Sequence, residues 1–326
     1  EISECLVGSE MCIRDRSYRN NTSWLEEYEE LMFGPSHSEQ TMSQAADIKY
    51  QYMPNMFFKY RSCSKNAFEA LEQDFLFSSQ PSKFNDIFEG AIEIVSEKAE
   101  RNIYQKVYNS LKSTNRFLAD RPTPSYHDLL ENIAISFGGS YQDIKQNHLL
   151  FLLMETLGIE AKRRFNDTIS SIQNNARNMY NICCFCATND SETMWAYYAD
   201  SHEGFCIGYD IKSLNNNLTH LTFPVLYKDH CTLQIDDIDH VDSSVCMHML
   251  TEKSLAWRHE KEWRTFFPPN PPNHKESMPT AKAVYLGARI LPESEECLKE
   301  ICNRKQIRIY KMVPIISEYK LIAIPL

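Results

Sequence analysis

Short strand-like segments lie near both ends of this 326-residue chain, and a long stretch with helical spacing separates them. On the N-terminal side, "NMFFKYRS" and "FLFSS" flank a short helical segment, "SKNAFEALEQD". A series of strand signals follows residue 178, from "NICCFCAT" to "YKLIAIPL". The pattern predicts an α+β fold with a mixed, mainly antiparallel sheet assembled from both ends of the chain and a helical insertion between them.

The domain boundaries follow from where the spacing changes. A single α+β domain is expected over residues 55–326, with the helical insertion at about 91–178. One further helix is expected at about 236–257. Residues 17–54 are interpreted as an N-terminal helix followed by a linker, because Gly, Pro and Ser interrupt the helical spacing after residue 33.

The first 16 residues are interpreted as foreign to the protein. Back-translation of "CLVGSEMCIRDR", residues 5–16, resembles an adapter used to prepare sequencing libraries. The stretch has neither the long apolar core of a signal peptide nor the Arg- and Ser-rich face of a transit peptide. Residues 1–16 are therefore expected to be a sequencing-adapter artefact that makes no packed contacts with the core.

Composition limits the partners that are expected. Hydrophobic residues make up 43% of the chain, as in folded globular proteins, and no run approaches the ~20 apolar residues of a membrane helix. The net charge of −10 argues against bulk duplex nucleic acid, although a local basic groove stays open. The 11 cysteines form no disulfide or zinc framework, which predicts a cytoplasmic location and no bound metal.

Two neighbouring stretches carry candidate binding residues. Arg61 ends a strand-like segment, where a guanidinium suits a phosphate or carboxylate, but an ion pair with an acid such as Glu89 would also explain it. The loop "FSSQPSKFNDIFEG" supplies four more candidates: Ser78, Ser79, Asn85 and Asp86. A loop next to such a strand is a typical place for a site, although hydrogen bonds that only hold the turn are the alternative.

A third stretch, "TMWAYYADSHEGFCIGYDI", combines aromatic residues with a histidine. Trp195 and Tyr198 fit one helical face, which is typical of core residues as well as of residues that contact a ligand. His202 lies in a polar turn and is the residue here expected to reach solvent.

A fourth stretch, "KSLAWRHEKEWRTFF", holds two acids beside an arginine. If residues 260–266 form a strand, Glu260, Glu262 and Arg264 share one face. Two such carboxylates are costly to bury without a purpose or a matched network. A surface ladder of ion pairs is the alternative explanation.

Six motifs in order resemble one protein family. They are "KYRS", "LFSSQPSKFNDIFEG", "MWAYYADSHEGFCIGYD", "PVLYKD", "WRHEKEWR" and "VYLGARI". The series is similar to that of the uncharacterised bacterial family catalogued as domain of unknown function 2971, from about Phe57 to about Leu291. Ile87 stands where many members carry proline. The family name implies no activity.

A more remote resemblance, in the order of elements only, is to the ADP-ribosyltransferase fold. Those enzymes place a basic residue on the first strand, a serine at the end of the next, and a catalytic glutamate, sometimes as E-x-E, on a late strand. The resemblance implies an NAD-consuming transferase or NAD glycohydrolase with NAD as substrate and an unknown macromolecular acceptor. Arg61 would hold the pyrophosphate, Glu262 would contact the ribose and Glu260 would activate the acceptor, unless an ion pair with Arg264 reverses the two glutamates.

Two other functions stay open. The chain could be a non-catalytic binding or sensor module for a peptide or nucleic acid, or a metal-dependent nuclease built on Asp86, Glu89 and Glu262. The sequence lacks a tight carboxylate and lysine cluster that would favour the nuclease. The enzyme hypothesis further predicts that seven residues line or border one cleft: Arg61, Ser78, Asn85, Asp86, Trp195, Tyr198 and Glu262.

Overall fold

The chain divides into two compact units. The first comprises residues 1–88, 179–229 and 251–326, and the second comprises 89–178 and 230–250. The computed structural model describes residues 23–36, 38–92, 109, 113, 163, 166–212, 217–231, 242–269, 271 and 274–326. The predictions for residues 1–16 and for most of the helical insertion therefore lie outside the described residues. In the second unit, residues 166–178 are helical and α11 spans Ser243–Met249.

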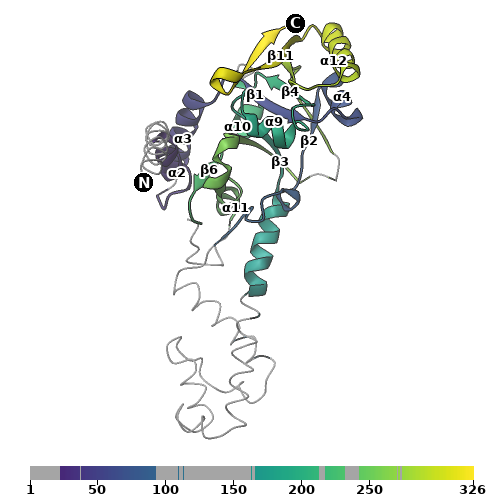
Figure 1. Ribbon diagram of the computed structural model, residues 1–326. Helices are drawn as coiled ribbons and strands as arrows, with labels where there is room; N and C mark the ends of the chain where they lie inside the picture. Colours follow the sequence, from purple (N-terminus) through teal and green to yellow (C-terminus); the bar gives the residue numbers. More distant parts are fainter. Residues whose placement is uncertain are drawn as a thin grey trace, which may run out of the picture. The chain divides into compact units, whose positions relative to one another are not determined.

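An eight-stranded sheet forms the centre of the first unit, with the strand order β12-β11-β10-β4-β1-β3-β8-β5 (Figure 1). In that order the strands are β12 (Lys320–Pro325), β11 (Arg308–Ile315), β10 (Ala283–Leu286), β4 (Phe205–Tyr209), β1 (Phe57–Arg61), β3 (Asn181–Cys186), β8 (Glu262–Phe267) and β5 (Thr222–Pro224). Every neighbouring pair is antiparallel except β10 with β11. The predicted α+β class and the mainly antiparallel sheet built from both ends of the chain are confirmed.

Two short sheets accompany the large one. The antiparallel sheet pairs β2 (Phe75–Phe77) with β9 (Lys275–Ser277), and the parallel sheet pairs β6 (Leu226–Lys228) with β7 (Glu252–Ser254). The helix expected at about 236–257 is corrected, because α11 ends at Met249. After Met249 the backbone pairs with β6 instead of continuing the helix, and the Leu226 amide donates to the Thr251 carbonyl at 2.8 Å.

Helices cover both faces of the large sheet because side chains alternate along its strands. On one face, Phe57 of β1 packs with buried residues of α4 (Lys65–Glu72) and α12 (Pro292–Lys305). On the other face, Phe58 and Tyr60 pack with residues of α9 (Glu192–Tyr198). None of the described helices is long and apolar enough to cross a membrane.

Two helices, α2 (Ser23–Phe33) and α3 (Glu39–Tyr52), precede the sheet. The linker predicted after residue 33 is therefore corrected, because most of it is helical. Ser38 and Thr41 explain the helix start: the Ser38 hydroxyl accepts from the Thr41 amide at 3.3 Å, and the Thr41 hydroxyl accepts from the Ser38 amide at 2.8 Å. This reciprocal cap starts a new helix directly after the Gly-Pro break.

The sheet is nearly interrupted at its centre. β1 and β3 share one register pair, Phe58 with Cys186, whereas β1 shares five with β4 and β3 shares six with β8. Beyond that pair, Ser79 bonds to Ile182 of β3 in both directions, at 3.1 and 2.8 Å. Lys59 of β1 donates to the Cys184 carbonyl at 2.7 Å. We call this divergence of β1 from β3 the central gap.

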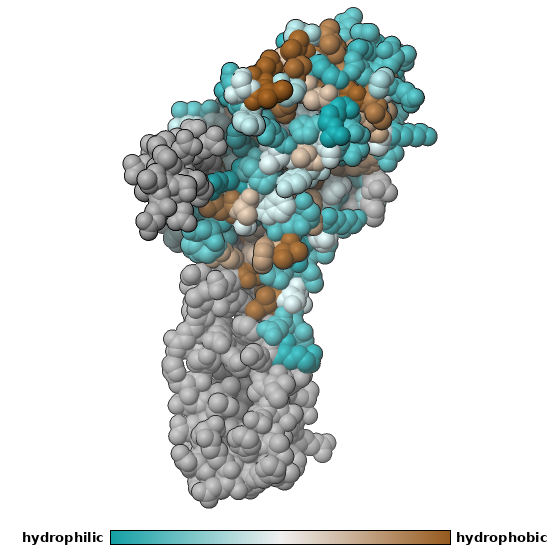
Figure 2. Space-filling model, in the orientation of Figure 1, coloured by the Kyte–Doolittle hydropathy of each residue, from teal (hydrophilic) through white to brown (hydrophobic). Residues whose placement is uncertain are grey.

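The two edge strands of the large sheet are β5 and β12, and apolar side chains gather near β12. Figure 2 shows them in brown at the end of the first unit where β11 and β12 lie. Ile322 and Ile324 of β12 are each 42% exposed. Lys320 and Pro325 lie near the two ends of the strand, and such residues on an edge strand discourage pairing with a second chain.

Candidate active site

A cavity of about 340 Å³ lies at the central gap, with walls from β1, β3, α9, the loop after β2 and the start of β8. Four of the predicted site residues line it: Asn85, Tyr198, Glu260 and Glu262. The structure thus brings together residues that lie up to 177 positions apart and come from all three chain segments of the first unit.

The two glutamates meet through a turn rather than through strand alternation. Glu260 ends the 3-10 helix η4 (Leu255–Glu260), Lys261 adopts a left-handed conformation with φ of 42°, and Glu262 begins β8. The expectation of one strand over 260–266 is therefore corrected. Both glutamates are buried, 4% and 5% exposed, so the surface-ladder alternative is also wrong.

Lys253 joins the two carboxylates. Its ammonium contacts Oε2 of Glu260 and lies 2.9 Å from Oε2 of Glu262. Arg264, which is fully buried, donates from Nε to Oε1 of Glu262 at 2.9 Å. Two cations therefore match two carboxylates, which is the arrangement that makes a buried charge cluster tolerable.

These pairings set the charge states of the cluster. Burial raises the pKa of Glu262, but Arg264 and Lys253 outweigh that effect and hold the pKa well below its ordinary value. Burial lowers the pKa of Lys253, but the nearby carboxylates of Glu262 and Glu260 more than offset it, so that the pKa is raised. Glu262 is therefore a carboxylate, and Lys253 an ammonium, at neutral pH.

Glu260 has a different set of partners. Tyr198 donates its hydroxyl to Oε1 of Glu260 at 2.6 Å, and Asn85 Nδ2 donates to the Tyr198 hydroxyl at 3.1 Å. Burial and the Glu260 carboxylate raise the pKa of Tyr198, so the phenol keeps its proton and remains a donor. Tyr198 is placed by α9, whose first turn is capped by Ser191.

Three of the other predicted residues hold the surrounding structure. Ser78 donates to Oε1 of Glu276 at 2.8 Å, and Ser79 takes part in the pairing with Ile182. Asp86 accepts from the Phe88 amide at 2.9 Å, as expected of a side chain that holds its own turn. None of Ser78, Ser79 and Asp86 lines the cavity.

Trp195 and His202 also lie outside the cavity wall. Trp195 is fully buried, packs edge-on against Tyr60 at 5.2 Å and donates from Nε1 to the Asn189 carbonyl at 2.8 Å. His202 stacks on Trp195 at 6.3 Å, in a turn of left-handed residues. Their contacts identify them as supports of α9 and of the turn that follows it.

Arg61 does not enter the cavity either. It shares a face of β1 with Phe57 and Lys59, whereas Phe58 and Tyr60 point to the other face. Its buried Nε has no hydrogen-bond partner among the residues that the structure describes. Of the seven residues of the predicted cleft, three line the cavity: Asn85, Tyr198 and Glu262. Glu89, the acid considered for an ion pair or a nuclease site, belongs to the second unit.

The other ten lining residues were not among the candidates from the sequence, and three of them are lysines: Lys59, Lys83 and Lys253. Lys253 opens the quoted stretch "KSLAWRHEKEWRTFF", but its contact with the glutamates depends on the fold of η4, which spacing alone does not reveal. The chain therefore does contain a tight carboxylate and lysine cluster, contrary to the sequence analysis. Burial and the neighbouring Arg61 lower the pKa of Lys59, whose ammonium has a carbonyl as its hydrogen-bond acceptor.

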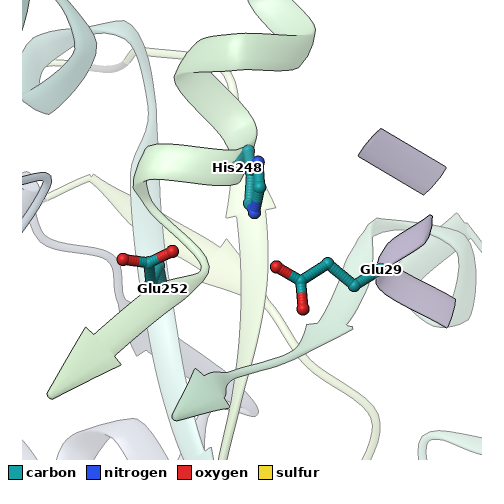
Figure 3. Close-up of side chains that lie close together, drawn as sticks. All are labelled: Glu29, His248 and Glu252. Atoms are coloured by element: carbon teal, nitrogen blue, oxygen red, sulfur yellow. The ribbon is translucent and has the colours of Figure 1, made fainter. Parts of the chain in front are cut away.

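Figure 3 shows three side chains with the chemistry of metal ligands: Glu29, His248 and Glu252. Glu29 on α2 and Glu252 on β7 belong to the first unit, whereas His248 belongs to α11 in the second. Glu29 also pairs with Lys228 at 2.5 Å. Because the group draws on both units, no metal site is assigned to it.

One family model matches the chain, over residues 194–265, and its description is "Protein of unknown function (DUF2971)". These residues carry the DUF2971 signature. The resemblance to that family is confirmed, and the DUF2971 segment contains Tyr198, Lys253, Glu260, Glu262 and Arg264. No curated protein and no solved structure matches the chain, so the comparisons do not support the remote resemblance to ADP-ribosyltransferases.

Proposed function

We propose that the cavity is the active site of an ADP-ribosyltransferase-like enzyme that consumes NAD and modifies a macromolecular acceptor. The observation that carries the proposal is the unequal state of the two buried glutamates. Both oxygens of Glu262 are held by Arg264 and Lys253, whereas each oxygen of Glu260 accepts one hydrogen bond, from Tyr198 or from Lys253. Glu260 therefore keeps acceptor capacity toward a ligand in the cavity.

The charge of the cavity favours a substrate that carries phosphate. Three lysines line it, Lys59, Lys83 and Lys253, against the carboxylates of Glu260 and Glu262. This local excess of positive charge stands in a chain whose net charge is −10. Lysine ammonium groups at a pocket attract and position phosphate oxygens. The exposed Lys83 and the half-buried Lys59 are the lysines left for this role, because both glutamates engage Lys253.

The chemistry follows from the carboxylate. When the bond between ribose C1′ and the nicotinamide nitrogen breaks, the electron pair leaves with neutral nicotinamide and the ribose gains oxocarbenium character. A carboxylate at the ribose hydroxyls stabilises that charge as it forms. The acceptor then bonds to C1′ and releases its proton. In this scheme Glu260 contacts the ribose and Glu262 positions Lys253, which reverses the roles expected from the E-x-E resemblance.

Nicotinamide release from NAD by the purified full-length chain, with and without mixed acceptors, tests the proposal. Glu260→Gln keeps the size of the side chain and removes its charge, so turnover should fall ~100-fold or more. Glu276→Gln is the matched control, because Glu276 is also a buried strand glutamate but does not line the cavity. It should retain wild-type turnover.

Two results would contradict the proposal: a wild-type chain that never releases nicotinamide with any acceptor, or a Glu260→Gln variant as active as wild type. The cluster would then be structural, and the binding or sensor module would be the better hypothesis.

A metal-dependent nuclease is the second candidate, because the carboxylate and lysine cluster whose absence counted against it is present. Its proposed ligands do not coincide, however, since Asp86 lies outside the cavity that Glu262 lines. Incubation of a labelled oligonucleotide with Mg²⁺ or Mn²⁺ separates the two candidates. Cleavage that requires the ion and Glu260, without nicotinamide release, would favour the nuclease.

A further inference from the structure

Three aromatic rings form a row next to the cavity. The His259 ring lies 6.3 Å from the Tyr197 ring and 6.1 Å from the Trp257 ring, centroid to centroid. Tyr197 is 68% exposed, and Trp257 and His259 are half-buried. We call Tyr197, His259 and Trp257 the aromatic row.

The row borders the proposed active site through the chain itself. Tyr197 precedes Tyr198 on α9, and His259 precedes Glu260 on η4, and both of those following residues line the cavity. His259 Nδ1 lies 3.2 Å from the Ala256 carbonyl, which fixes the orientation of the central ring. Two residues of the aromatic row are therefore bonded neighbours of residues that line the cavity.

The side of the row formed by η4 is basic. In the stretch 255–261 the exposed ionisable residues are Arg258 and Lys261, while the one acid, Glu260, is buried. Lys83, also exposed, lines the cavity, whereas α9 carries the exposed acid Glu192 in its first turn. The η4 side of the row is thus opposite in sign to the net charge of the chain and is complementary to a polyanion.

We infer that the aromatic row and its basic neighbours bind single-stranded nucleic acid, which is the acceptor class of the enzyme proposed above. Exposed rings stack on bases of any sequence, and nearby lysine and arginine side chains neutralise the phosphates. A duplex hides its base faces and therefore cannot use the row. The role of the nucleic acid as acceptor rests on the proposed function, whereas its binding to the aromatic row does not.

Fluorescence anisotropy of a labelled oligouridine or oligothymidine of ~12 nucleotides, without NAD, tests the binding. Tyr197→Ala should weaken binding at least ~5-fold because a stacking ring is lost, whereas Tyr197→Phe should bind like wild type. Lys261→Gln should reduce the slope of log Kd against log salt by ~0.7. Tyr319→Ala, which removes an 86% exposed tyrosine next to the far edge strand of the sheet, is the matched control and should bind like wild type.

Three results would overturn the inference: no binding by wild type, full binding by Tyr197→Ala, or equal competition by a polyglutamate peptide, which would reassign the surface to acidic peptides. The assay is independent of the reaction. Binding without any nicotinamide release would refute the proposed function alone, and nicotinamide release without oligonucleotide binding would refute this inference alone.

Discussion

Glu262 pairs with two buried cations, Lys253 and Arg264, so its substitution should affect the stability of the fold. Glu262→Gln leaves Arg264 and Lys253 with reduced compensation in the interior. Removal of one partner from a buried ion pair costs ~3–5 kcal/mol, so we expect the free energy of unfolding to fall by about that amount. Urea denaturation measures it. Glu260→Gln should lose less, because Arg264 keeps its pair. A Glu262→Gln variant as stable as wild type would show that the cluster is not needed for folding.

Lys49 makes stability depend on pH. The side chain is 5% exposed, and its ammonium donates to the Thr219 and His220 carbonyls at 3.2 and 3.1 Å. Burial lowers the pKa of Lys49 from 10.5 to about 8. Between those two values the unfolded chain holds a proton that the folded chain has released, so this group adds stability as pH rises through about 8 and its contribution levels off above 10.5.

Lys49→Met removes this dependence. The difference in free energy of unfolding, wild type minus Lys49→Met, should rise by up to about 3 kcal/mol from pH 7 to pH 10.5. Only the difference is informative, because buried cysteines and tyrosines titrate in the same range. Urea denaturation at a series of pH values measures it, and a difference that stays constant would mean that Lys49 keeps an ordinary pKa in the fold.

The turn between α9 and β4 leaves little room for a larger side chain. Asp200, Ser201 and His202 all have positive φ, and Gly204 then lies against backbone on two sides. A Cβ at Gly204 would come within 2.1 Å of the Arg61 carbonyl oxygen and 2.8 Å of that of Ala199. Backbone in a paired strand cannot move away.

Gly204→Ala should therefore lower the free energy of unfolding by ~3 kcal/mol or more. Gly208→Ala, on the strand β4 that follows the turn, is the matched comparison, because the close atom there is the flexible end of Met56, at 2.8 Å. Thermal unfolding of both variants provides the measurement. Equal melting temperatures for the two would mean that the turn can shift as a whole.

Elements defined by local spacing were predictable, and elements defined by distant contacts were not. The strand of Phe57 to Arg61 and the helix capped by Ser64 carry their signals within a few residues. The η4 segment does not, because its short turns depend on Lys253 meeting two glutamates. The sequence predicted that Glu260 and Glu262 lie close together, but it did so from the alternation of side chains along a strand. In the structure a turn at the left-handed Lys261 brings them together.

At the scale of the whole molecule, the chain that forms the first unit is interrupted twice in sequence, by residues 89–178 and 230–250 of the second unit. Strand signals at both ends of the sequence were enough to predict a common sheet. They did not predict that β1 would leave β3 after a single pair, because that depends on Ser79 and Lys59 competing for the same edge.

The central gap also determines how the sheet can deform. It divides the eight strands into a group of five, β12 to β1, and a group of three, β3 to β5, each tied internally by longer ladders than the one register pair between them. A small rotation of one group against the other strains few hydrogen bonds, and each such bond contributes only ~1 kcal/mol net. The width of the cavity therefore depends on the strand contact that the fewest register pairs hold, so access to the proposed active site would vary with rotation of the two strand groups.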